Sequence, residues 1–175
     1  MAVVTTADSG LRAPDLGATI VQLRNPAASA RELEREARAL VERSPVPVVV
    51  NARVDVALAV GAAGVNLPEQ DLPVAEVRRL LGPDRLLGRS VHSAGAAREA
   101  EAEGADYVVF GPVFASASHP GRQAAGLPAL AGVAAAVRIP VLAIGGIDRA
   151  RAEECLRHGA AGFAAISLFE RERAW

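Results

Sequence analysis

The sequence contains no lysine: all nineteen of its basic residues are arginine. This excludes Schiff-base chemistry on a lysine side chain, and it removes the usual point-charge ligand for a phosphate. Cys155 is the single cysteine, which excludes a disulfide framework and a multi-cysteine metal site. Aromatic residues account for only 3% of a chain that is 51% hydrophobic, so alanine and the branched aliphatic residues must build the core.

Neither sign of charge is in excess, since the formal net charge at pH 7 is -1. Such a balance gives no electrostatic reason to bind nucleic acid or an anionic membrane surface. The chain also lacks a basic N-terminal stretch followed by an apolar one, and no apolar run approaches the length of a membrane span. We therefore expect a cytoplasmic protein with no nucleic-acid and no membrane partner, folded as one domain over residues 1–175.

What the sequence does contain is a signature repeated four times, in which a glycine closes a helical segment and a β-branched or aromatic run follows within a few residues. The four copies are Gly17–Val21, Gly61–Val65, Gly104–Val108 and Gly159–Phe163. Glycine suits the left-handed C-cap of a helix, and the run after it suits a strand that is buried on both faces. Helices that alternate with such strands indicate a parallel sheet.

Eight apolar runs are expected to be strands. They span residues 2–5, 19–23, 47–51, 64–67, 86–90, 106–110, 140–144 and 162–167. Eight strands alternating with helices predict a compact (β/α)8 TIM barrel. Its outer helices should be shortened, because 175 residues over eight units leave roughly 22 for each unit, whereas a typical barrel has about 250 residues in all. A doubly wound open sheet is the structural alternative.

Polar residues stand at the expected carboxyl ends of three strands, where barrels of this class bind their ligands. These residues are Gln22, Arg24, Asn51 and Ser90. We expect the four of them to bind substrate, although a barrel without a site would also place some polar residues where strand ends meet solvent.

A phosphate site is expected at the ends of the last two strands, formed by Gly145, Gly146, Ile166 and Ser167. Glycines let backbone N–H groups approach an anion closely. A short terminal helix that begins near Ser167 would add the positive end of its dipole.

The segment GPVFASASHPGRQAAG, residues 111–126, interrupts the core-building pattern with small and polar residues, and we expect it to be a ligand-binding loop at the barrel mouth. Within it, Ser116 and Ser118 offer hydroxyl groups to a substrate. His119 is either a group that moves a proton near neutral pH or a solvated loop histidine. His92, just beyond the fifth expected strand, either faces the site or packs in the wall.

Five ordered motifs resemble the family of thiamine phosphate synthases and thiazole tautomerases (TenI-like proteins). The motifs are Val21–Arg24, Asn51–Ala57, Gly88–Ser93, Asp106–Phe114 and Pro140–Ile147. The resemblance covers nearly the whole chain and implies a (β/α)8 barrel that handles a phosphorylated thiazole in thiamine biosynthesis. It also implies that Ser116, Ser118 and His119 stand where the synthases have two threonines and a lysine, in a loop that closes over the ligands.

The chain departs from the synthases at several positions of that resemblance. The synthase reaction joins a pyrimidine diphosphate to the thiazole phosphate and needs Mg²⁺ for the leaving pyrophosphate. Pro26 replaces a lysine, Ala52 replaces a metal-binding aspartate and His119 replaces the loop lysine, whereas Asp71 matches the second metal-binding aspartate. A site for a diphosphate would lose electrostatic stabilisation through these replacements.

The tautomerase branch needs no metal, so the resemblance favours a metal-independent, cofactor-free thiazole tautomerase-like isomerase. That branch has its catalytic histidine where this chain has Pro112, which leaves His119 and His92 as the candidate catalytic residues. The alternatives are a thiamine phosphate synthase, with Mg²⁺ bound through Asp71, and a relative that binds thiazole or thiamine phosphate without catalysis. We also expect a homodimer, because little chain remains for the last outer helix and bare apolar barrel wall is costly.

Overall fold

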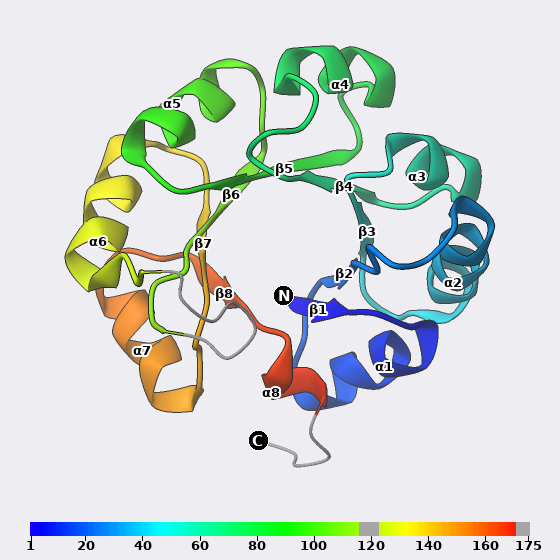
Figure 1. The fold of residues 1–175 in the computed structure, drawn as a ribbon, viewed down its shortest axis with the longest axis horizontal. Coiled ribbons are helices and arrows are strands. Elements are labelled where there is room, and N and C mark those ends of the chain that lie inside the picture. Colours follow the sequence, from blue (N-terminus) through cyan, green and yellow to red (C-terminus); the bar gives the residue numbers. More distant parts are fainter. Residues whose placement is uncertain (116–122, 171–175) are drawn as a thin grey trace.

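The computed structural model describes residues 1–115 and 123–170, and its eight parallel strands pair in the order in which they occur in the sequence. The strands are β1 (Ala2–Val4), β2 (Val21–Leu23), β3 (Val48–Asn51), β4 (Gly64–Leu67), β5 (Leu86–Val91), β6 (Tyr107–Phe110), β7 (Val141–Ile144) and β8 (Gly162–Ala164). The two edges of the sheet meet, because the Val3 N–H donates to the Ala165 carbonyl (2.9 Å) and the Ala165 N–H donates to the Met1 carbonyl (3.1 Å). Figure 1 shows the resulting ring of strands inside a ring of helices. The (β/α)8 barrel is confirmed, and the open sheet is wrong.

The outer helices are short, as the length of the chain requires. They are α1 (Ala7–Arg12), the 3-10 helix η1 (Ala13–Leu16), α2 (Ala30–Arg43), α3 (Val54–Val60), α4 (Val74–Leu81), α5 (Ala94–Ala102), α6 (Gly126–Ala136), α7 (Arg149–Arg157) and α8 (Ser167–Glu170). Helix α2 begins with a capping box, in which the Ser29 N–H donates to Glu32 Oε2 (2.8 Å) and the Glu32 N–H donates to Ser29 Oγ (3.3 Å). Over the described residues, no helix has both the length and the apolar character needed to cross a membrane.

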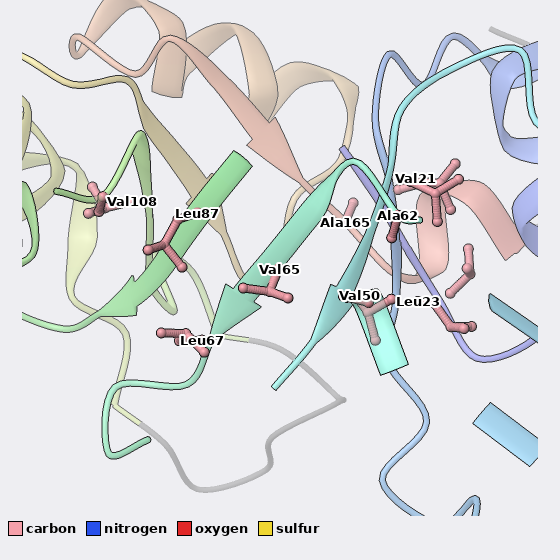
Figure 2. Packing of buried hydrophobic residues seen from close by; sticks show 14 of the residues in the cluster. Val21, Leu23, Val50, Ala62, Val65, Leu67, Leu87, Val108 and Ala165 are labelled. Atoms are coloured by element: carbon pink, nitrogen blue, oxygen red, sulfur yellow. The ribbon is translucent and has the colours of Figure 1, made fainter. Parts of the chain in front are cut away.

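Buried side chains form two layers, because successive residues of a strand point to opposite faces of the sheet. The outer layer lies between the strands and the helices and includes Val21, Val50, Val65 and Val108 (Figure 2). The inner layer fills the barrel and consists of Met1, Val3, Val49, Tyr107, Val109 and Ala164. Neighbours in the sequence, such as Val49 and Val50, therefore belong to different layers.

Tyr107 is the aromatic side chain of the inner layer, and it fits because Gly88 lies beside it. The two residues pair in register across β5 and β6. A Cβ at position 88 would lie 2.2 Å from Tyr107 Cζ, so the ring occupies the space that any other residue at position 88 would need. Burial raises the pKa of the Tyr107 hydroxyl far above its usual value, and in the described part of the chain this hydroxyl has no hydrogen-bond partner. The ring thus fills the barrel interior below the strand ends.

The lone cysteine is a packing residue. Cys155 lies on α7 with none of its surface exposed, and burial raises the pKa of its thiol above the usual value. A thiol in this setting is a poor nucleophile.

Candidate functional site

A cavity of about 410 Å³ opens at the carboxyl ends of the strands. Residues from all eight strands, or from the positions directly after them, contribute to its lining. Seven of the site residues expected from the sequence line it: Gln22, Arg24, Asn51, Ser90, His92, Gly145 and Ile166. The cavity therefore lies where the polar strand ends predict a site.

One side of the cavity is polar and is built by four consecutive strands, β2 to β5. Gln22 Nε2 donates to Asn51 Oδ1 (3.1 Å), and Asn66 Nδ2 donates to Ser90 Oγ (3.1 Å). Gln22 and Asn66 are 3% and 1% exposed, so these bonds hold the two amides in fixed orientations inside the barrel. Asn66 Oδ1 has no partner among the described residues. The two pairs place the amides of Gln22 and Asn51 and the hydroxyl of Ser90 in the cavity lining, and Asn66 holds Ser90 from outside that lining.

The opposite side of the cavity is apolar. Val3 comes from β1, Val109 from β6, Ile144 from the end of β7 and Ile166 from the turn after β8. A site with one polar and one apolar wall suits a flat ring whose faces are hydrophobic and whose edge carries hydrogen-bonding groups.

Arg24 supplies positive charge at the mouth. It follows β2 directly, and its N–H donates to the Val4 carbonyl (2.8 Å), which fixes the backbone at this point. Arg24 lines the cavity, and its guanidinium forms no ion pair with any residue that the structure describes. An unpaired arginine at the rim of a cavity is suited to a phosphate or diphosphate.

His92 is held by Glu69, a residue that the sequence did not single out. Glu69 Oε1 accepts the His92 backbone N–H (3.0 Å), and Glu69 Oε2 lies 2.7 Å from His92 Nδ1. Arg89 fixes the turn that carries Glu69 by donating to the Glu69 carbonyl (2.7 Å) and to the Leu72 carbonyl (2.9 Å). Since Nδ1 is engaged, Nε2 is the ring nitrogen of His92 that remains for a ligand. Glu69 and His92 both line the cavity.

The Gly145–Gly146 turn after β7 has a conformation that requires glycine. The two residues have φ values of +98° and +63°, in the left-handed region that other residues rarely adopt. A Cβ on Gly145 would lie 2.6 Å from Pro112 Cβ, and one on Gly146 would lie 2.5 Å from the Ala115 carbonyl oxygen. Gly145 lines the cavity, whereas Gly146 packs beneath the start of the 111–126 loop.

The remaining predicted site residues either do not line the cavity or lie outside the described residues. Ser167 is the first residue of α8 and is exposed, and it does not belong to the cavity lining. Ser116, Ser118 and His119 lie outside the described residues. Their roles stay predictions.

The positions that the resemblance connects with a metal do not form a carboxylate cluster. Ala52, with φ +63°, places a methyl group beside Asn51. Asp71 is absent from the cavity lining, and its Oδ1 accepts the Leu72 N–H (2.8 Å). In the ranges 1–115 and 123–170, no three His, Cys, Asp or Glu residues come together in a way that could hold a metal ion.

Comparison with known proteins agrees with the barrel architecture. The model of the thiamine monophosphate synthase family matches residues 3–169. A thiamine-phosphate synthase of Chloroflexus aurantiacus is 47% identical over 155 residues, which cover 86% of this chain and 71% of that protein. A putative thiamine-phosphate synthase 2 of Aquifex aeolicus is 43% identical over 156 residues, which cover 87% of this chain and 83% of that protein.

Among solved structures, thiamine phosphate pyrophosphorylase from Pyrococcus furiosus superposes with a TM-score of 0.86 at 36% sequence identity. The superposition covers 98% of this chain and 87% of that one. The family model, the identities and the shared barrel lead to one conclusion: this chain belongs to the thiamine monophosphate synthase family.

Proposed function

We propose that this protein works in thiamine biosynthesis as a thiamine-phosphate synthase, which joins a pyrimidine diphosphate to a thiazole phosphate. The names of its relatives support this reaction better than the tautomerase that the sequence favoured. The observation that carries the proposal is the cavity at the strand ends, which combines a polar wall, an apolar wall, an unpaired arginine and a glycine turn.

Each wall of the cavity would bind a different part of the two substrates. Gln22 and Asn51 would orient the ring that carries hydrogen-bonding groups, while Val109 and Ile144 pack against its faces. Arg24 would neutralise part of the charge on the diphosphate, and the backbone N–H groups of the glycine turn would receive the thiazole phosphate. A carbon–nitrogen bond then forms between the two rings as pyrophosphate leaves. Holding both rings in one cavity converts an encounter of two solutes into a step within one complex.

The Mg²⁺ that the synthase reaction implies does not fit the described residues well. Magnesium is bound through one or two carboxylates together with substrate phosphates. Position 52 is alanine, Asp71 lies away from the cavity lining, and both oxygens of Glu69 are engaged by His92. We therefore derive no step through the metal.

The contact between Glu69 and His92 favours a second candidate, the metal-independent thiazole tautomerase. A carboxylate on Nδ1 holds the imidazole in the tautomer whose Nε2 accepts a proton, as a general base requires. His92 is then the candidate base within the described residues, and His119 remains the other candidate predicted from the sequence. Pro112, at the position of the family base, lines the same cavity but has no proton to exchange.

Two assays on the purified protein separate these functions. The first supplies pyrimidine diphosphate and thiazole phosphate, with Mg²⁺ or with a chelator, and measures thiamine phosphate. The second follows the conversion of a thiazole carboxylate phosphate tautomer into its aromatic form. Product in the first assay supports the synthase, and conversion in the second assay alone supports the tautomerase. Tight binding of thiazole phosphate without turnover in either assay would leave a non-catalytic relative.

A further inference from the structure

Arg151, in the first turn of α7, connects three parts of the barrel mouth. Its NH1 group donates to the Gly146 carbonyl (2.8 Å). Its guanidinium carbon lies 4.9 Å from the centre of the Phe114 ring, at the start of the 111–126 loop. Its Nε lies 3.7 Å from Asp148 Oδ2, and Asp148 caps α7 by accepting the Arg151 N–H (2.9 Å). The side chain therefore sits where the β6 loop, the glycine turn and α7 meet.

These contacts determine which way the peptide groups of the glycine turn point. In a trans peptide the carbonyl and the following N–H point in opposite directions. The Gly145 carbonyl accepts the Phe114 N–H (3.1 Å), and the Gly146 carbonyl accepts the Arg151 guanidinium. The N–H groups of Gly146 and Ile147 are consequently turned away from Phe114 and Arg151. Neither N–H has a hydrogen-bond acceptor among the described residues.

Two successive N–H groups that point the same way form a concavity for an anion. We infer that Arg151 is a positioning residue for phosphate binding, because its bond to the Gly146 carbonyl fixes the direction of the Ile147 N–H. The inference rests on the proposed function, in which this turn receives the phosphate of the thiazole. It assigns to Arg151 an indirect role: the guanidinium acts on the carbonyl side of the peptide, and the N–H side meets the ligand.

Stability of the fold is a poor alternative explanation for these contacts. The side chain of Arg151 is 45% exposed, so it fills no space in the core. The Gly146 carbonyl has no other hydrogen-bond donor in the described part of the chain, so Arg151 alone fixes this peptide plane from the carbonyl side.

The test compares Arg151→Met with a matched control, Arg157→Met. Methionine keeps an apolar stem over Phe114 but removes the donor to Gly146. Arg157 is an exposed residue in the last turn of the same helix, so its replacement changes the net charge equally at the far end of α7. Calorimetric titration of each variant with thiazole phosphate and with the unphosphorylated thiazole alcohol separates the phosphate contribution from that of the ring.

We expect Arg151→Met to raise the Kd for thiazole phosphate about tenfold and to leave the Kd for the alcohol unchanged. Arg157→Met should bind both ligands as the wild type does. An unchanged Kd for the phosphate ester in Arg151→Met, or an equal loss for ester and alcohol, would overturn the inference.

A second measurement needs no ligand and therefore separates this inference from the proposed function. Arg151→Met should shift the backbone amide NMR resonances of Gly146 and Ile147, and Arg157→Met should not. Unshifted resonances in Arg151→Met overturn the positioning role. A wild-type protein that binds the ester no better than the alcohol contradicts the phosphate site itself, while the amide resonances still decide how Arg151 acts on the turn.

Discussion

Replacing Gly145 by alanine should both destabilise the barrel and weaken phosphate binding. At φ +98° a residue with a Cβ is strained by about 1–2 kcal/mol. The new Cβ would also lie 2.6 Å from Pro112 Cβ and 2.7 Å from Pro112 Cα. Since Pro112 Cα belongs to the backbone and cannot rotate away, we add a strain of about 1–3 kcal/mol for overpacking. The expected loss of unfolding free energy is about 2–5 kcal/mol.

Urea denaturation of Gly145→Ala measures this loss directly, and Gly132→Ala is its matched control. Gly132 lies within α6, where an added Cβ meets no atom within 4 Å. The same chemical change should therefore stabilise the helix there, by up to about 1 kcal/mol. With a slope of about 2 kcal/mol per M urea, the midpoint of Gly145→Ala should fall by roughly 1–2.5 M while that of Gly132→Ala stays level or rises. A Gly145→Ala midpoint equal to that of the wild type would refute the reasoning.

Three further predictions concern the core, the surface and the assembly. Gly88→Ala should lower the unfolding free energy by about 1–3 kcal/mol, because the new Cβ would lie 2.2 Å from Tyr107 Cζ. Thermal denaturation checks this, and an unchanged melting temperature would contradict the described packing. The hydrogen bond from Arg53 lowers the pKa of Asp55, so this pair adds stability above the unfolded-state pKa and loses it as the pH falls through the folded-state pKa. Asp55→Asn should accordingly lower the urea midpoint slightly at neutral pH and not in strongly acidic solution, and a loss that persists in acid would argue against the ion pair. The homodimer remains a prediction from the sequence: light scattering should give about twice the chain mass of 18.0 kDa, and a single-chain mass would contradict it.

The strands were predictable because their signal is local. Runs such as residues 47–51 and 140–144 are rich in β-branched and aliphatic residues, and burial on both faces of a parallel sheet demands such runs. The boundaries were less accurate, since hydrogen bonds to neighbouring strands set where a strand begins and ends. The last expected strand, residues 162–167, ends at Ala164 because the chain turns into α8 at Ser167.

The part of the candidate site that is formed by strand ends could be predicted from the sequence. The part that depends on contacts between loops could not. Gln22, Asn51 and Ser90 follow from strand position alone, because the carboxyl ends of all barrel strands meet at one face. Glu69 touches His92 from 23 positions away, and that contact depends on how the turn after β4 folds over β5. The one signal for Glu69 in the sequence was a carboxylate shortly after the end of an expected strand.

The most direct test of the proposed function is the formation of thiamine phosphate by the purified wild-type protein from pyrimidine diphosphate and thiazole phosphate. Chromatography with mass detection would follow the product and the released pyrophosphate over time, with Mg²⁺ in one series and a chelator in the other. A synthase should release thiamine phosphate and pyrophosphate in equal amounts, at a rate proportional to protein concentration, in at least one series. Product no faster than in buffer in both series, from protein that binds thiazole phosphate, would contradict the synthase assignment.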